Sequence, residues 1–168
     1  MSENQMIRQG RGTAYMASSL VETPSMSLLR DEIPEGALMF SFDPSDPDNE
    51  QMVFKSAKDG TRTWEQHIEH PFKIVNWVVK KIMLPNETTK ELNPAVRIVF
   101  FDDEGETLVF VSVGVAMDLD LIRTLRGDGP YNPPIPVTVS AVKTRNGFKT
   151  LRLTPVPRQV IVGKAKSK

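Results

Sequence analysis

Residues 72–81 have the sequence FKIVNWVVKK, and two further apolar runs follow: AVRIVFFD at residues 95–102 and TLVFVSV at residues 107–113. The second and third runs predict strands with apolar residues on both faces. In the second run, Val96, Ile98 and Phe100 are expected on one face and Arg97, Val99 and Phe101 on the other. The first run does not alternate cleanly, which predicts a bulge or bend in a long strand. The acidic residues 102–105 (DDEG) predict a hairpin turn between the second and third strands.

A helix and two more strands are predicted after these runs. In residues 117–125, Met117, Leu121 and Leu125 share one apolar face, which Leu119 and Ile122 extend. Residues 135–144 and 148–154 alternate again and predict two strands. They are joined by Arg145-Asn146-Gly147, in which Asn-Gly is a strong hairpin signal.

The resulting order of strand, strand, strand, helix, strand, strand is that of the OB-fold, a small barrel that binds oligonucleotides. The sequence therefore predicts a mainly β protein. We expect a five-stranded OB-fold barrel over residues 71–156, with one short helix between its third and fourth strands. Residues 1–70 are expected to form an acidic, partly ordered N-terminal extension, to which residues 37–42 and 52–56 add a β-hairpin. Residues 157–168 are expected to form a basic, flexible tail.

The net charge of zero conceals an uneven distribution of charge along the chain. Residues 1–70 carry a net charge of −6 and residues 71–168 a net charge of +6. After Asp128 there is no carboxylate side chain, whereas eight lysines and arginines remain. A strongly basic end favours attraction to a polyanion, although a solvated surface with a basic tail has the same composition.

Composition and motifs give little support to an enzyme. There is no cysteine, which excludes disulfides, thiolate metal sites and cysteine nucleophiles. We find no phosphate-binding loop, dinucleotide glycine motif or nucleophile elbow. His67 and His70 could share a helix face, but nothing nearby completes a zinc site. The carboxylates of residues 102–106 could hold Mg²⁺, but a solvated turn is the more common arrangement.

We therefore expect no catalytic activity, no cofactor, no metal and no small-molecule substrate. The apolar runs are too short to span a membrane, and the N-terminus lacks a secretory signal. These features, with the lack of cysteine, predict a soluble cytoplasmic protein.

Single-stranded nucleic acid is held by basic grooves in which aromatic side chains stack on bases. The last predicted hairpin combines both residue types, and other positions could complete the surface. The candidate nucleic-acid-binding residues are Trp77, Arg97, Phe110, Tyr131, Lys143, Arg145, Phe148, Lys149 and Arg152. Trp77 and Phe110 also suit core positions, and Tyr131 could pack the helix against the barrel. Phe148, between basic neighbours at the turn, is the strongest aromatic candidate.

Two segments carry a resemblance to a known group of proteins. They are residues 95–114 (AVRIVFFDDEGETLVFVSVG) and residues 136–153 (PVTVSAVKTRNGFKTLRL), separated by the predicted helix. This layout resembles the single-stranded DNA-binding proteins of bacteriophages and mobile elements, including those of the protein-primed replication group. The shared pattern is a D-x-x-G turn, a strand with a serine near its end, a helix, and a hairpin of the type K-T-x-x-G-x-x-x-x-x-L. The resemblance covers about residues 72–155.

The resemblance implies a protein that coats single-stranded DNA without sequence preference during replication or recombination, in the bacterial cytoplasm if phage-encoded. It also implies no cofactor. Replication proteins and further copies of this chain are candidate partners, and the sequence does not determine the oligomeric state. The chain departs from the pattern in its long acidic N-terminal segment and in its basic tail, where many cellular relatives have an acidic tip. The acidic segment could recruit partners or cover the basic face.

Two other functions are compatible with the same pattern. One is a structural or interaction module of a virion or scaffold, built on the same small barrel, because a fold does not determine a function. The other is an RNA-binding OB module, since phosphates and base faces are common to both nucleic acids.

Overall fold

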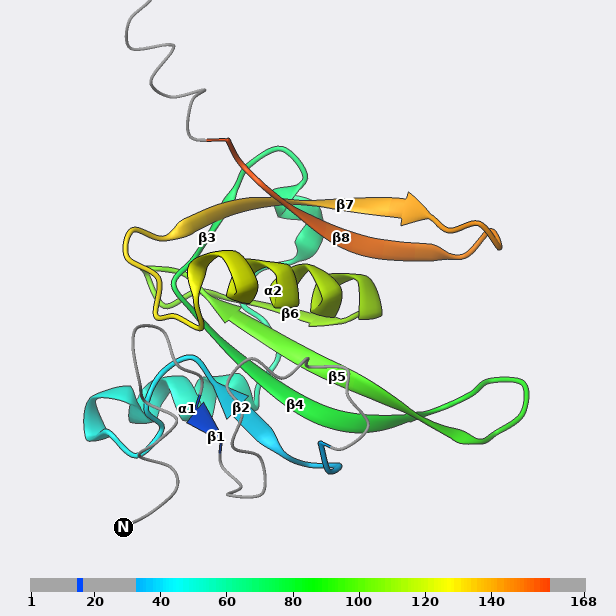
Figure 1. The fold of residues 1–168 in the computed structure, drawn as a ribbon, viewed down its shortest axis with the longest axis horizontal. Helices are drawn as coiled ribbons and strands as arrows, with labels where there is room; N and C mark the ends of the chain where they lie inside the picture. Colours follow the sequence, from blue (N-terminus) through cyan, green and yellow to red (C-terminus); the bar gives the residue numbers. More distant parts are fainter. Residues whose placement is uncertain (1–14, 17–32, 158–168) are drawn as a thin grey trace, which may run out of the picture.

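The computed structural model describes residues 15–16 and 33–157, and the predicted flexible tail lies almost entirely outside them (Figure 1). The described chain is mainly β, as predicted, with two antiparallel sheets and two α-helices. The larger sheet contains, in spatial order, β1 (Tyr15–Met16), β2 (Leu38–Phe40), β4 (Asn76–Pro85), β5 (Leu92–Phe101) and β6 (Thr107–Val111). The smaller sheet contains β3 (Phe72–Ile74), β7 (Ile135–Lys143) and β8 (Lys149–Pro155).

Two α-helices and two short 3-10 helices complete the described chain. They are η2 (Pro47–Asn49), α1 (Glu50–Ser56), η3 (Trp64–His67) and α2 (Val113–Arg126). Helix α2 lies between β8 of the smaller sheet and β5 of the larger one (Figure 1). Neither α-helix in the described part of the chain is long and apolar enough to cross a membrane.

The irregular first run is one strand that bends at Val75 and belongs to both sheets. Ile74 pairs with Ile135 in the smaller sheet, and Asn76 pairs with Phe101 in the larger one. At the bend, the Val75 N–H donates to the Phe101 carbonyl at 2.8 Å, and the Val75 carbonyl accepts from the Tyr131 N–H at 2.9 Å. The predicted bend is confirmed, and it holds the two sheets together.

The predicted closed barrel is not found, because no ladder joins β6 to β8 among the described strands. A side-chain hydrogen bond links the end of β6 to β8 at the start of α2. There the Ser112 hydroxyl donates to the Leu151 carbonyl at 3.3 Å and also accepts from the Val115 N–H, so that it caps the helix. The seam is thus filled by a helix rather than by strand pairing.

The main core lies between the inner faces of the two sheets and the buried side of α2. Trp77 and Val79 of β4 point into this core, as do Val96, Ile98 and Phe100 of β5, the three residues predicted to share one face. The largest fully buried side chains include Trp77, Phe72, Phe100, Ile74, Ile98, Leu108 and Leu119. Residues from Ile33 onward contribute to this core through Ala37 and Met39, so the second half of the predicted extension is built into the fold.

A second, smaller cluster lies on the outer face of the larger sheet. It consists of Phe40, Phe42, Val78, Val99 and Phe101, with Met52 and Val53 packed against it. Met52 and Val53 belong to α1, so the predicted strand at residues 52–56 is wrong. This run is short, and its adjacent apolar residues suit a helix lying on a sheet as well as a strand. The strand predicted at residues 37–42 is found as β2, but it pairs with β4.

Helix α2 starts earlier than predicted, and its apolar face is divided. Val115, Ala116, Leu119 and Ile122 are buried in the core. The side chains at four-residue spacing, Val113, Met117, Leu121 and Leu125, are instead exposed, by 46–77%. The most regular apolar stripe therefore does not determine which side of α2 faces the core.

Gly114 in the first turn of α2 provides one such constraint and a test of the packing. A Cβ atom at this position would overlap the backbone carbonyl oxygen of Leu151. Replacing a helical glycine with alanine ordinarily stabilises a helix by about 0.5–1 kcal/mol. We expect Gly114→Ala to lower the free energy of unfolding by about 1–3 kcal/mol instead, measured by urea denaturation.

Thr124→Ala, at an exposed position of the same helix, is the matched control. We expect it to change the free energy of unfolding by no more than about 0.5 kcal/mol. If Gly114→Ala were stabilising, α2 would not approach β8 as closely as described.

Candidate nucleic-acid interface

The turn between β7 and β8 forms the projecting end of a hairpin. The Thr144 N–H donates to the Phe148 carbonyl at 2.6 Å, and the Gly147 N–H donates to the Thr144 carbonyl at 2.9 Å. Gly147 has φ 86°, a conformation that favours glycine. The Asn-Gly signal therefore predicted this turn correctly, and hydrogen bonds define the position of its residues.

We call Lys143, Arg145, Phe148 and Lys149 the basic tip. All four side chains are exposed, and the Phe148 ring is 71% accessible although it is large and apolar. Lys143 and Lys149 are directly opposite each other in the β7–β8 ladder. Like charges at opposed positions destabilise a sheet, and no ion pair joins these cations to a carboxylate of the described residues.

Three predicted aromatic residues do not reach this surface. Trp77, Phe110 and Tyr131 are exposed by 0%, 2% and 5%. A ring without an accessible face cannot stack on a base, so the prediction that these three bind nucleic acid is wrong. Trp77 is paired with Phe100 and Phe110 with Ile98, on the inner face of the sheet. Both faces of β4 and β5 carry buried apolar residues, so alternation alone did not decide which side chains reach the surface.

The buried aromatic residues help to fix the loop after α2. The Arg123 guanidinium, itself buried, lies 5.4 Å from the centroid of the Trp77 ring and pairs with Asp128 at 2.6 Å. The Tyr131 hydroxyl donates to the Gly127 carbonyl at 2.8 Å. Burial raises the pKa of Tyr131 to about 12. These contacts are structural, and sequence patterns did not reveal the burial of Arg123.

Arg97 is on the outer face of the larger sheet, away from the basic tip. Its guanidinium donates to the carbonyls of Ser56 and Lys58 at 2.5 and 2.7 Å. Both acceptors are at the C-terminal end of α1, where a cation is favourable because carbonyl groups lack helical partners. Arg97 therefore holds α1 on the sheet, and this structure does not bring it together with the other candidates.

Arg152 is also engaged within the fold. Its guanidinium forms two hydrogen bonds with the buried Asp118 carboxylate, at 2.9 and 2.6 Å, and the Leu153 N–H donates to the same carboxylate at 2.8 Å. The hydrogen bonds to Asp118 raise the pKa of Arg152. Asp118 thus ties α2 to β8, a role that its position in an amphipathic helix did not predict.

The β4–β5 hairpin ends on the same side of the molecule as the basic tip (Figure 1). Its turn is closed by the Asn86 side chain, which accepts from the N–H groups of Thr88 and Thr89 at 2.8 and 3.0 Å. Leu84 and Leu92, near this turn, are 42% and 61% exposed. In OB-folds, the loops at these two places in the strand order flank the surface that binds oligonucleotides.

The two groups of residues considered for metal binding lie close together. His67, His70 and Asp102–Glu104 line one polar pocket of about 280 Å³. His67 Nδ1 is 2.8 Å from the His70 carbonyl, so this nitrogen carries the proton. In the described part of the chain, however, no group of three or more such side chains is placed to hold a metal ion.

Comparison with protein-family models, with curated proteins and with solved structures found no match for this chain. Its function is therefore inferred from the geometry and charge of the described residues.

The role of Arg152 can be separated from that of the basic tip by stability measurements. Arg152→Ala leaves the buried Asp118 carboxylate with only the Leu153 N–H, so we expect the free energy of unfolding to fall by about 1–3 kcal/mol. Lys149→Ala removes an exposed cation and should change it by no more than about 0.5 kcal/mol. Equal stability of the two variants in urea denaturation would contradict a structural role for Arg152.

Proposed function

We propose that this protein binds single-stranded DNA without sequence preference and coats it during replication or recombination of a phage or mobile element. We further propose that the bent strand β3–β4, with β5, β6, β7 and β8, corresponds to the five strands of an OB-fold left open between its third and fifth strands. The observation that supports the function best is the basic tip. It combines exposed, unpaired cations with an exposed aromatic ring at a well-defined turn.

The mechanism follows from the chemistry of the basic tip. Lys143, Arg145 and Lys149 attract phosphates, and bound phosphate relieves the repulsion between the opposed lysines. The Phe148 ring stacks on a base, which contributes about 1–3 kcal/mol with little sequence preference. Both interactions use parts common to all nucleotides, so binding is expected to be independent of sequence.

The strand is expected to lie between the two hairpins. Helix α1 covers part of the outer face of the larger sheet, including β5, which corresponds to one of the two strands whose face binds oligonucleotides in OB-folds. This cover leaves the hairpin ends as the accessible parts of the surface. The acidic N-terminal segment was expected to cover the basic face. Among its described residues, Met52 and Val53 of α1 instead pack on the apolar outer face of the larger sheet.

Phe148→Ala tests the stacking contribution. We expect the affinity for labelled oligothymidine, measured by fluorescence anisotropy at low salt, to fall about 5- to 150-fold, the equivalent of one stacked base. Because the ring is exposed, the variant should unfold like the wild type. Unchanged affinity would place the site elsewhere.

The salt dependence of binding tests the electrostatic contribution. Affinity should fall steeply with salt, and replacing Lys143, Arg145 and Lys149 together with alanine should reduce the log–log slope by about 2. Lys73→Ala is the control, since Lys73 is an exposed cation on β3. Duplex DNA and RNA of the same length serve as competitors. Failure of the wild type to bind any of the three nucleic acids at low salt would exclude the proposed function itself.

One observation favours a second candidate, a structural or interaction module. The exposed stripe of Val113, Met117, Leu121 and Leu125 on α2 is a contiguous apolar surface of the kind found at protein contacts. An interaction module would show self-association or partner binding without affinity for nucleic acid.

A further inference from the structure

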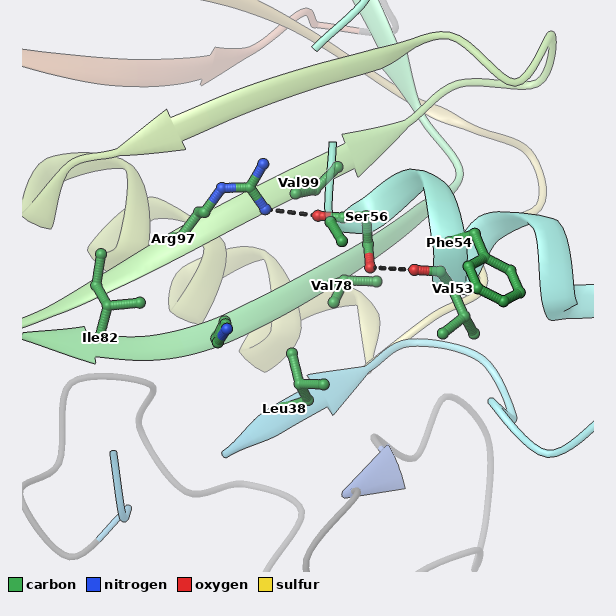
Figure 2. A pocket seen from close by; sticks show the side chains of 10 residues that line it. Leu38, Val53, Phe54, Ser56, Val78, Ile82, Arg97 and Val99 are labelled. Carbon is green, nitrogen blue, oxygen red and sulfur yellow. Dashed lines mark hydrogen bonds between the residues drawn. The ribbon is translucent and has the colours of Figure 1, made fainter. Parts of the chain in front are cut away.

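A groove lies between α1 and the outer face of the larger sheet (Figure 2). It has a volume of about 410 Å³, within the range of ligand pockets. Its apolar lining comes from four elements, β2, α1, β4 and β5, and includes Leu38, Val53, Phe54, Val78, Ile82 and Val99. The groove is therefore a built feature of the fold, since its walls belong to separate, packed elements.

The charges at this groove have one sign. Lys80 and Arg97 are the charged residues among those that line it, and none of the described lining residues carries a carboxylate. Lys80 and Arg97 are directly opposite each other in the β4–β5 ladder, which again places like charges side by side. The hydrogen bonds from Arg97 to Ser56 and Lys58 hold its guanidinium at the end of α1. A bound carboxylate near the pair would relieve their repulsion.

We propose that this groove binds an acidic amphipathic peptide segment of a partner protein. Apolar side chains of the segment enter between α1 and β4, and a carboxylate lies against Lys80 and Arg97. The lining is mostly aliphatic, which suits such side chains better than stacked bases, because bases require flat aromatic platforms. Phe54, the aromatic ring in the lining, extends from α1 away from the sheet (Figure 2).

The groove and the basic tip are formed by different elements. The groove uses α1, β2, β4 and β5, whereas the basic tip belongs to the β7–β8 hairpin. A partner held in the groove would therefore leave the basic tip accessible. This inference concerns a protein-binding site and does not require that the protein bind DNA.

The test uses fluorescence anisotropy of the full chain with a short labelled peptide that alternates Asp with Leu. A peptide with Lys in place of Asp is the control ligand. We expect the wild type to bind the acidic peptide and not the basic one. Lys80→Glu should weaken binding about tenfold, because it replaces one attraction at the rim with repulsion. Ala57→Phe should weaken binding to a similar extent, because Ala57 is an exposed lining residue whose enlargement fills the groove.

Lys73→Glu is the matched control for charge and should bind the acidic peptide like the wild type. Equal binding of both peptides, no binding of either, or full binding by both Lys80→Glu and Ala57→Phe would overturn the proposal. One further pair of results would overturn the proposal: oligothymidine displaces the peptide, and Lys80→Glu binds oligothymidine more weakly than the wild type. Together these results would assign the groove to nucleic acid. Phe148→Ala should leave peptide binding unchanged, because Phe148 does not line the groove. Failure of the DNA-binding proposal can therefore be distinguished from failure of the peptide-binding proposal.

Discussion

The bend at Val75 is the constraint on which the rest of the structure depends. Because a single strand pairs with β7 before the bend and with β5 after it, the two sheets face each other across one core. The Val75 backbone satisfies both of its hydrogen-bonding groups at this corner, through Phe101 and Tyr131. Val75 therefore has no unpaired backbone group at the bend, where an unpaired group shielded from water would be costly.

The sheets do not close into a barrel, and α2 replaces the missing ladder. Asp118 accepts from Arg152 and from the Leu153 N–H, and Gly114 allows the close approach to Leu151. These contacts require the side of the helix around residue 118 to face β8. The stripe of Met117, Leu121 and Leu125 then points outward. A buried, fully hydrogen-bonded carboxylate thus sets the rotation of the helix against its most regular apolar pattern.

The sequence predicted features that depend on local periodicity and turn chemistry. These include the strands of the segment 72–155, the bend in the first run and the Asn146-Gly147 hairpin. Four of the nine candidate residues lie together in the basic tip of this hairpin. Features set by tertiary contacts were not predictable in this way. Residues 52–56 form a helix because Met52 and Val53 lie on an apolar sheet face, and Arg97 and Arg152 are engaged by partners distant in sequence. Trp77 and Phe110 were misassigned because the smaller sheet and α2 cover the face on which they lie, a tertiary contact that the strand pattern does not reveal.

Both proposed sites share one electrostatic feature. Each contains two cations directly opposite each other in a ladder, Lys143 with Lys149 and Lys80 with Arg97. Such pairs destabilise a sheet relative to neutral or opposite-charge pairs, and neither contributes to the core. A ligand that supplies negative charge removes the repulsion. In the proposals above, this ligand is a phosphate at the hairpin and a carboxylate at the groove. Arg97 also holds α1 on the sheet through the carbonyls of Ser56 and Lys58, so its charge has a structural role as well. At each of the two sites, the like charges favour a bound state in which the ligand supplies negative charge.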